Sequence, residues 1–350
     1  MHISRRSLQA ALGGVWLIDA GLQLQPYMFG PHFAHDVIGG AASGQPGWIA
    51  GTVHAASALI AHAPVWGNVT FAGIQAAIGA GLLWSRTSRV ALGASIAWAG
   101  GIWLFGEGLG GLAGGHASLL TGLPGAVLLY AVLAVAAWPQ RGDPLDGRAP
   151  APLVLGAWAL AWATGALFQL LPGQSSAGQL AATVTGGGTG APAWLSGVDA
   201  AIGHWLERVG PAGVGVLVVV ELAIGLGALS SRRLARWASI AGAFAALAIW
   251  VVGEAFGQVL SGHSTDPNSG PLLVLLALVT YSAADAMDDR HWAGLHTLLV
   301  YLPDRRRSPR STVTPLITLD RPHTPTPALV NVTRDVGRMA EYEASGASSV

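Results

Sequence analysis

The sequence predicts an all-α, polytopic membrane protein with about eight transmembrane helices, arranged as two pseudo-symmetric four-helix halves. Of the 350 residues, 52% are hydrophobic and only 10% are charged, whereas soluble domains carry about 25% charged residues. The mean hydropathy is +0.50, so most of the chain is expected to lie away from water. Apolar stretches close to the roughly 20 residues that cross a bilayer recur along the chain. The early and late parts of the sequence also match each other.

Eight apolar stretches, each closed by charged residues, Pro or Gly clusters, are expected to form the membrane helices. They cover residues 9–29, 67–84, 90–107, 123–139, 152–171, 212–229, 236–254 and 270–287. All 18 basic residues are Arg, and in this arrangement 17 of them fall on one side, with only Arg208 opposite. Because Arg-rich loops stay in the cytoplasm, a multi-pass protein of the cell membrane with both termini in the cytoplasm is predicted.

The N-terminus offers a competing interpretation. Residues 4–8 read SRRSL, which is similar to a twin-arginine export signal that would be removed. However, no A-x-A cleavage pattern follows, and Asp19 interrupts the apolar region. A retained first membrane helix is therefore the preferred interpretation.

The composition excludes several classes of function. The chain has no Cys, which excludes disulfides, thiol redox motifs, Fe–S ligation and Cys-zinc sites. Its 18 basic residues are matched by 18 acidic ones, so a nucleic-acid partner is not expected and the lipid bilayer is the expected environment. Residues 288–350 are poor in apolar groups and predict a mostly disordered cytoplasmic tail.

An internal repeat is the strongest signal in the sequence. Residues 103–110 read WLFGEGLG, and residues 250–257 read WVVGEAFG at an offset of 147. The same offset places Gly115-His116 on Gly262-His263 and Pro124 on Pro271, whereas upstream matches use an offset of 146. Residues 1–145 and 150–287 are therefore predicted to be tandem four-helix copies. Since each copy has an even number of spans, a pseudo-two-fold axis along the membrane normal should relate them.

The repeated unit resembles a known family. The helix that begins at Trp16 reads WLIDAGLQ, and the segment from Glu221 reads ELAIGLGAL before an Arg-containing turn. The segment from Gly253 reads GEAFG and is followed by GHSTDP from Gly262. These motifs resemble the DoxX/DoxD family of four-helix membrane proteins, which includes the small subunit of thiosulfate:quinone oxidoreductase. The resemblance implies a quinone-linked or redox-associated membrane role, although here the unit is duplicated and the partner subunit is not part of the chain.

Polar side chains at mid-membrane depth are the first candidates for chemistry. Asp19, Gln75 and Glu221 lie near the centres of their predicted spans, and Gln75 and Glu221 are repeat equivalents. A carboxylate at that depth costs about 2.5–3.5 kcal/mol on insertion scales. Proton relay or hydrogen bonding to a quinone carbonyl would explain the two acids, Asp19 and Glu221, which are therefore the catalytic candidates. A neutral acid that bonds a neighbouring helix explains them equally simply.

A paired motif on the outer side is the second candidate. Glu107 lies nine residues before His116, and Glu254 lies nine before His263. A carboxylate at the C-terminal end of a helix is electrostatically unfavourable, so a protonated His, a metal ion or turn amides should compensate. Two Glu and two His would also suit a divalent metal. Ligand contact, metal binding and plain capping of the loop stay open as alternatives.

Two short amphipathic helices are predicted on the same side, at about 47–62 and 193–209. Each follows a G-x-P-x-W sequence and repeats apolar residues at helical spacing. Both are too short to span a bilayer, so they are expected to lie in the interface, as a strap or as a lid over the bundle.

Three functions follow from these features. The first is a DoxX-like membrane subunit of a quinone-linked redox system at the extracytoplasmic face, with a quinone as cofactor and a separate redox partner subunit. The second is a small-molecule or ion carrier with a site between the two halves. The third is a membrane scaffold or assembly factor with no site of its own.

Overall fold

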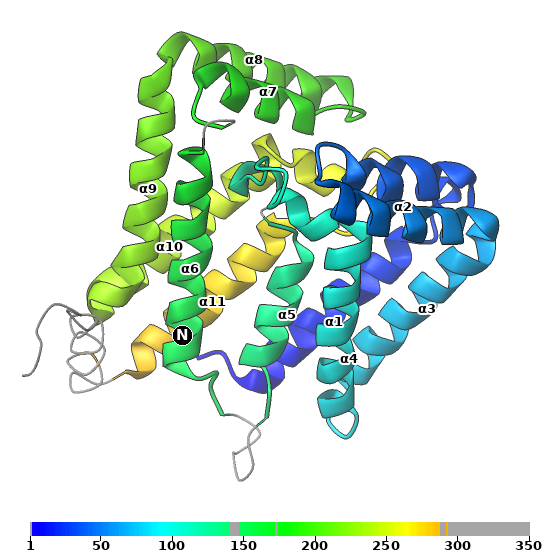
Figure 1. Ribbon diagram of the computed structural model, residues 1–350. Coiled ribbons are helices and arrows are strands. Elements are labelled where there is room, and N and C mark those ends of the chain that lie inside the picture. Colours follow the sequence, from blue (N-terminus) through cyan, green and yellow to red (C-terminus); the bar gives the residue numbers. More distant parts are fainter. Residues whose placement is uncertain (1, 123, 140–146, 172–173, 288–291, 293–350) are drawn as a thin grey trace, which may run out of the picture. The chain divides into compact units, whose positions relative to one another are not determined.

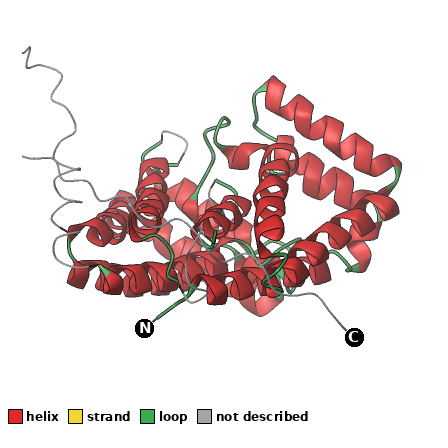
Figure 2. Ribbon diagram, turned by 90° about the horizontal axis from the view of Figure 1, so that it is seen from below, coloured by secondary structure: helices red, strands yellow, loops and turns green. Residues whose placement is uncertain are grey.

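The computed structural model describes residues 2–122, 124–139, 147–171, 174–287 and 292, and in this part of the chain all regular structure is helical (Figure 2). The predicted all-α class is therefore confirmed. The tail predicted at 288–350 lies outside the described residues, apart from Trp292.

Each of the eight predicted apolar stretches contains a helix (Figure 1). These helices are α1 (Arg5–Leu22), α3 (Pro64–Leu83), α4 (Ser88–Gly101), α5 (Val127–Ala136), α6 (Ala151–Gln169), α9 (Pro211–Ser230), α10 (Arg232–Val252) and α11 (Ser269–Ala286). Helix α4 continues through a π-helical turn, η4 (Ile102–Gly106).

Among the described residues, five helices are long and apolar enough to cross a membrane. They are α4 with η4, α6, α9, α10 and α11. Helix α5 has only ten residues, α1 carries two Arg and Asp19, and α3 carries Asn68 and Gln75. The structure therefore supports a multi-pass membrane protein, with the remaining three spans kept as a prediction.

The two short amphipathic helices are confirmed at the predicted positions, as α2 (Gly47–His62) and α8 (Ala193–Val209). In both, the Pro before the first helical residue has extended backbone angles and starts the helix. Helix α7 (Ala177–Gly187), which packs against α8, was not predicted, because its apolar residues are small and interrupted by Gly.

The helices pack in the same order in both parts of the chain. In the first part α1 packs on α3, α3 on α4, α4 on α5, and α5 back on α1. In the second part α6, α9, α10 and α11 make the same four contacts in the same sequence. Helix α5 contacts α11 and α6, so the fourth helix of each set lies at the junction between the sets (Figure 1).

Close approach of α1 and α3 depends on two glycines. A Cβ atom on Gly13 would lie 2.9 Å from the Gly79 carbonyl oxygen, and one on Gly79 would lie 2.8 Å from the Gly13 carbonyl oxygen. Small residues at a crossing let two helix backbones approach closely in a membrane. The α6–α9 pair crosses similarly, since a Cβ on Gly225 would lie 3.1 Å from the Ala159 carbonyl oxygen.

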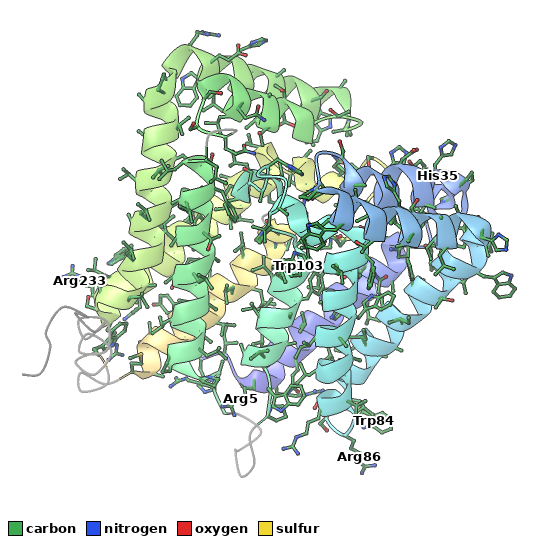
Figure 3. All side chains as sticks on the ribbon, viewed as in Figure 1. Arg5, His35, Trp84, Arg86, Trp103 and Arg233 are labelled. Carbon is green, nitrogen blue, oxygen red and sulfur yellow. The ribbon has the colours of Figure 1, made fainter. Side chains whose placement is uncertain are left out.

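Arginine side chains gather at one end of the helices. Arg5, Arg86 and Arg233 lie at this end, and His35 lies at the opposite end (Figure 3). The Arg6 guanidinium donates to the Leu82 carbonyl oxygen at 2.8 Å, which ties the start of α1 to the end of α3. Arg232 pairs with Asp285 at 2.9 Å.

Candidate functional site

Each copy of the outer motif contains a left-handed backbone turn directly after its Glu. Residues 108–111 all have positive φ, and so do residues 255–258, with φ between 44° and 65° in the second turn. A left-handed conformation costs about 1–2 kcal/mol for a residue with a side chain. The second turn holds Ala255, Phe256 and Gln258 in it, so the surrounding contacts must impose the turn.

Replacing a strained residue of the second turn with Gly should raise the stability of the protein. Ala255→Gly should stabilise the protein by about 1 kcal/mol, because Gly adopts positive φ without steric cost. The same change in an exposed right-handed helix, Ala201→Gly in α8, should destabilise by a similar amount. Thermal melting of both variants in detergent checks this, and a lower melting temperature for Ala255→Gly would contradict the strain argument.

Each left-handed turn aims a glutamate at the start of the following helix. The Glu254 carboxylate accepts from the Gly270 backbone N–H at 3.1 Å and from the Ser269 hydroxyl, at the N-terminus of α11. Glu107 interacts with the backbone N–H of Val127, the first residue of α5. Helix N-termini stabilise carboxylates, so each carboxylate is compensated by groups at the start of the following helix rather than by amides of the glycine-rich turn.

Two indole hydrogen bonds next to these turns show which Pro residues correspond in the predicted repeat. The Trp103 indole donates to the Pro124 carbonyl oxygen at 2.6 Å, and the Trp250 indole donates to the Pro267 carbonyl oxygen at 2.8 Å. The equivalent of Pro124 is therefore Pro267, and the match of Pro124 with Pro271 was wrong. An alignment without gaps could not show that the segment between the Trp and the Pro is four residues longer in the first copy.

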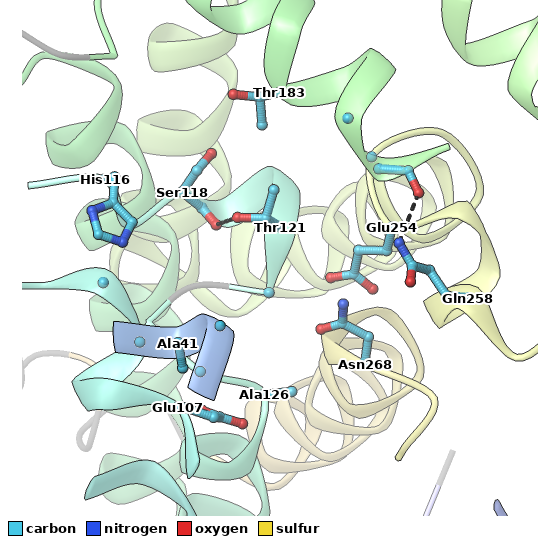
Figure 4. Close-up of a pocket in the computed structure, with 18 of the residues that line it drawn as sticks. Ala41, Glu107, His116, Ser118, Thr121, Ala126, Thr183, Glu254, Gln258 and Asn268 are labelled. Carbon is cyan, nitrogen blue, oxygen red and sulfur yellow. Dashed lines mark hydrogen bonds between the residues drawn. The ribbon is translucent and has the colours of Figure 1, made fainter. Parts of the chain in front are cut away.

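A polar outer cavity of about 1190 Å³ is lined by all four residues of the paired motif, Glu107, His116, Glu254 and His263. The first three of these residues are labelled in Figure 4. Within the described ranges, no hydrogen bond or ion pair joins either Glu to its His. The His263 ring instead lies 4.0 Å from the Tyr27 ring, between centroids. Among the same residues, no three His, Asp or Glu side chains gather closely enough to hold a metal ion.

An apolar inner cavity of about 840 Å³ lies beside the outer one. Helices α1, α2, α3 and α4 contribute walls that include Trp16, Ile60, Phe71 and Trp98. Asp19 and Gln75, two of the predicted mid-membrane residues, line it as well. The structure thus brings Asp19 and Gln75 together in one space.

Five buried polar atoms on side chains that line the inner cavity have no hydrogen-bond partner in the part of the chain that the structure describes. These atoms are Asp19 Oδ1, Gln23 Oε1, Gln75 Oε1, Trp98 Nε1 and Glu107 Oε2. The Tyr130 hydroxyl interacts with the Asp19 carboxyl group. An unpaired buried polar atom costs about 1–3 kcal/mol. The lining, which is mostly apolar with Asp19, Gln23 and Gln75 among it, favours a ligand that is mostly apolar and partly polar.

Glu107, Thr265 and Asp266 line both cavities and form the polar part of the wall between them. The Asp266 carboxylate accepts from the Asn268 backbone N–H at 2.7 Å and from the Thr265 hydroxyl at 2.9 Å. Burial raises the pKa of Asp266 above its usual value. A loop late in the chain therefore helps to close a cavity formed mostly by the early helices.

Sequence reasoning missed four residues of the inner site: Gln23, Trp98, Tyr130 and Asp266. They come from different helices and one loop, and only packing brings them together. Asp266 had a usable signal, since it belongs to the GHSTDP segment.

Glu221 lies apart from both cavities. Its side chain is 1% exposed, and neither carboxyl oxygen has a hydrogen-bond partner among the described residues. A Cβ on Gly165 of α6 would lie 3.4 Å from Glu221 Oε2, which places the carboxyl at the α6–α9 contact. The structure therefore does not bring Glu221 to Asp19 or to the paired outer motif.

Comparison of this chain with protein-family models, with curated proteins and with solved structures finds no match.

Proposed function

We propose that this protein is a DoxX/DoxD-like membrane subunit of a quinone-linked redox system, and that its inner cavity binds the quinone. In this proposal the chain crosses the cell membrane eight times, with both termini in the cytoplasm and its site near the extracytoplasmic face. The two four-helix halves are tandem copies. The repeated order of helix packing and the repeated left-handed turn support the duplication.

The observation that carries the quinone proposal is the inner cavity itself. A quinone is a flat apolar ring with oxygen atoms at its edge and an apolar tail. The cavity offers aromatic and aliphatic walls, together with polar side chains such as Asp19, Gln75 and Tyr130. Since the chain contains no Cys, the quinone would supply the redox chemistry, and a partner subunit would exchange electrons with it.

Asp19 and Gln75 would hold the ring oxygens, and Asp19 would exchange a proton with them. Glu107 and Asp266 would link this space to the polar outer cavity, because both residues line both cavities. Glu254 would hold the start of α11 in place through Ser269 and Gly270, and His116 and His263 would line the outer mouth.

Filling the inner cavity tests the proposal. Ala56 lines the cavity from α2, whereas Ala58 on the same helix is exposed. Ala56→Trp should abolish binding of a short-chain benzoquinone, because the indole would occupy the space of the ring. Ala58→Trp adds the same side chain outside the cavity and should leave the affinity unchanged. Equilibrium dialysis in detergent measures both, and equal affinities for the two variants would overturn the proposal.

A carrier is the second candidate function, because the two cavities share a wall of polar residues. In that case the inner cavity would pass its ligand to the outer side. Proteoliposomes loaded with a short-chain quinol and an external oxidant distinguish the two: a carrier speeds oxidation of the internal quinol, whereas a binding subunit alone does not.

A further inference from the structure

Exposure divides the lining of the inner cavity into a closed polar end and an open apolar end. At the closed end Asp19 is 1% exposed, Gln75 is 4% exposed and Tyr130 is fully buried. The exposed residues of the lining form its mouth: Ala55, Leu59 and Phe105. Leu59 is 72% exposed and Phe105 is 47% exposed. Among the described residues of the lining, all exposed side chains are therefore apolar, and they lie far from burial only on α2 and η4.

Helix α2 forms one side of the mouth and is fixed from behind. Its residues Ile49, Val53 and Ser57 are buried, and the Ser57 hydroxyl donates to the Ala34 carbonyl oxygen at 2.6 Å. An adjacent face of the helix lines the cavity at helical spacing, with Thr52, Ala55, Ala56 and Leu59. One face of α2 is thus packed on the chain, while the next face borders an open space.

The π-helical turn η4 forms the other side of the mouth, and α2 contacts it. The Glu107 backbone N–H donates to the Ile102 carbonyl oxygen at 2.9 Å, five residues back, so the helix is wider here than an α-helix. Ile102 and Phe105 of this turn line the cavity, and so does Gly101 before it. A Cβ atom on Gly101 would meet nothing within 4 Å, so open space reaches the helix backbone at the mouth.

The surroundings of the mouth are those of a membrane boundary. Helix α2 lies across the outer ends of α3 and α4 (Figure 1) and exposes Trp48, and α3 exposes Trp66 near its start. Trp gathers where the bilayer meets water. The outer cavity differs, because its exposed lining includes the polar residues Asp36, Ser43 and His263.

We propose that the inner cavity opens sideways into the outer part of the bilayer, between α2 and η4, and takes an amphiphile head first. The polar head would reach the closed end at Asp19 and Gln75, and the apolar chain would leave through the mouth into lipid. This inference rests on the proposed function for the head, and it adds the path and the chain. The ligand class is then a quinone that carries an alkyl or prenyl chain and is dissolved in the membrane.

A spin label tests whether the mouth faces lipid, without any ligand. The chain contains no Cys, so Leu59→Cys carries the only thiol and takes one nitroxide. Ser43→Cys is the control, since Ser43 is exposed and lines the outer cavity. In nanodiscs of phosphatidylcholine, oxygen should relax the label at position 59 more strongly than a water-soluble nickel chelate does. The label at position 43 should show the reverse order.

A bulky residue at the mouth tests the path of the chain. Two ligands with the same ring are compared on the full-length protein by equilibrium dialysis: dimethoxy-methyl-benzoquinone and its decyl derivative. Ala55→Trp should weaken binding of the decyl compound about tenfold, because the indole would overlap the chain, and it should leave the ring without a chain unaffected. Ala58→Trp, on the same helix but outside both cavities, should change neither affinity.

The outcomes separate the inference from the proposed function. If the nickel chelate reaches position 59 as readily as position 43, or if neither reagent reaches it because a second copy of the chain covers it, the mouth does not face lipid and the inference is wrong. It is also wrong if Ala55→Trp affects both ligands equally or neither. In these cases the proposed function stands. If neither ligand binds the parent protein, the proposed function is wrong and the inference falls with it.

Discussion

Gly79→Leu should leave little folded protein, because the new side chain has no space at the crossing of α1 and α3. Even a Cβ atom there would lie 2.8 Å from the Gly13 carbonyl oxygen and from Leu17 Cγ. The obstacle is partly backbone, which cannot rotate away, so the helices must separate. Overpacking costs typically 1–3 kcal/mol and sometimes more, and loss of this crossing should cost on the order of 3 kcal/mol or more.

The matched control is Gly73→Leu on the same helix. Gly73 is exposed, and a Cβ there meets nothing within 4 Å. Melting temperature in detergent and recovery of monodisperse protein by size-exclusion chromatography measure both variants. Gly73→Leu should behave as the parent protein, so equal losses for the two variants would show that the close crossing of α1 and α3 is not required.

Stability should fall as the pH rises from about 4.5 to above 7, and Glu254 should account for a separable part of this fall. Burial raises the pKa of Glu254 from 4.5 to about 7, although its bonds to Ser269 and Gly270 oppose the shift. Below pH 4.5 the carboxyl is protonated in both the folded and the unfolded protein, so folding costs nothing extra. Above pH 7 the folded protein must hold the buried charge, which costs on the order of 3 kcal/mol.

Glu254→Gln should remove this part of the pH dependence. The Gln carbonyl oxygen still accepts from Gly270, and its amide does not ionise. The difference in melting temperature between pH 5 and pH 8 should therefore be smaller in the variant than in the parent protein. Glu207→Gln, at an exposed position of α8, is the control. If Glu254→Gln keeps the full pH dependence, the buried charge of Glu254 is not its cause.

Local signals were enough to place most helices from the sequence. Apolar runs located α6, α9 and α11 closely, and the G-x-P-x-W sequences located α2 and α8. The left-handed turns were not predictable, because Phe256 and Gln258 give no local sign of positive φ. The second turn is instead held by residues that follow in the chain, since the Ser264 hydroxyl donates to the Gly257 carbonyl oxygen at 2.7 Å.

The candidate site was predictable only in part, for a related reason. Asp19 and Gln75 were predicted because a polar residue inside an apolar stretch can be recognised from the sequence alone. Trp98 and Tyr130 look like ordinary apolar or interfacial residues in the sequence, and only packing brings them to the same cavity as Asp19. Glu221 was also recognised from the sequence, but helix packing places it outside both cavities.

In the proposed duplication, matched positions of the two halves pack with different residues. In the first half the Trp16 indole donates to the Ser95 hydroxyl at 2.9 Å. At the repeat position of Ser95 the second half has Gly242, which makes room for the Trp158 ring. The second half likewise has Gly165 in place of Asp19, and Glu221 in place of Gln75.

Such differences have a consequence for how the protein could have been built. In a symmetric homodimer of one four-helix unit, every substitution appears twice, so a ring that fills one subunit would also fill the other. Joining the two units in a single chain removes that constraint. In the proposed duplication, one half can then keep the inner cavity, while the Trp158 ring packs against Gly242 in the other half.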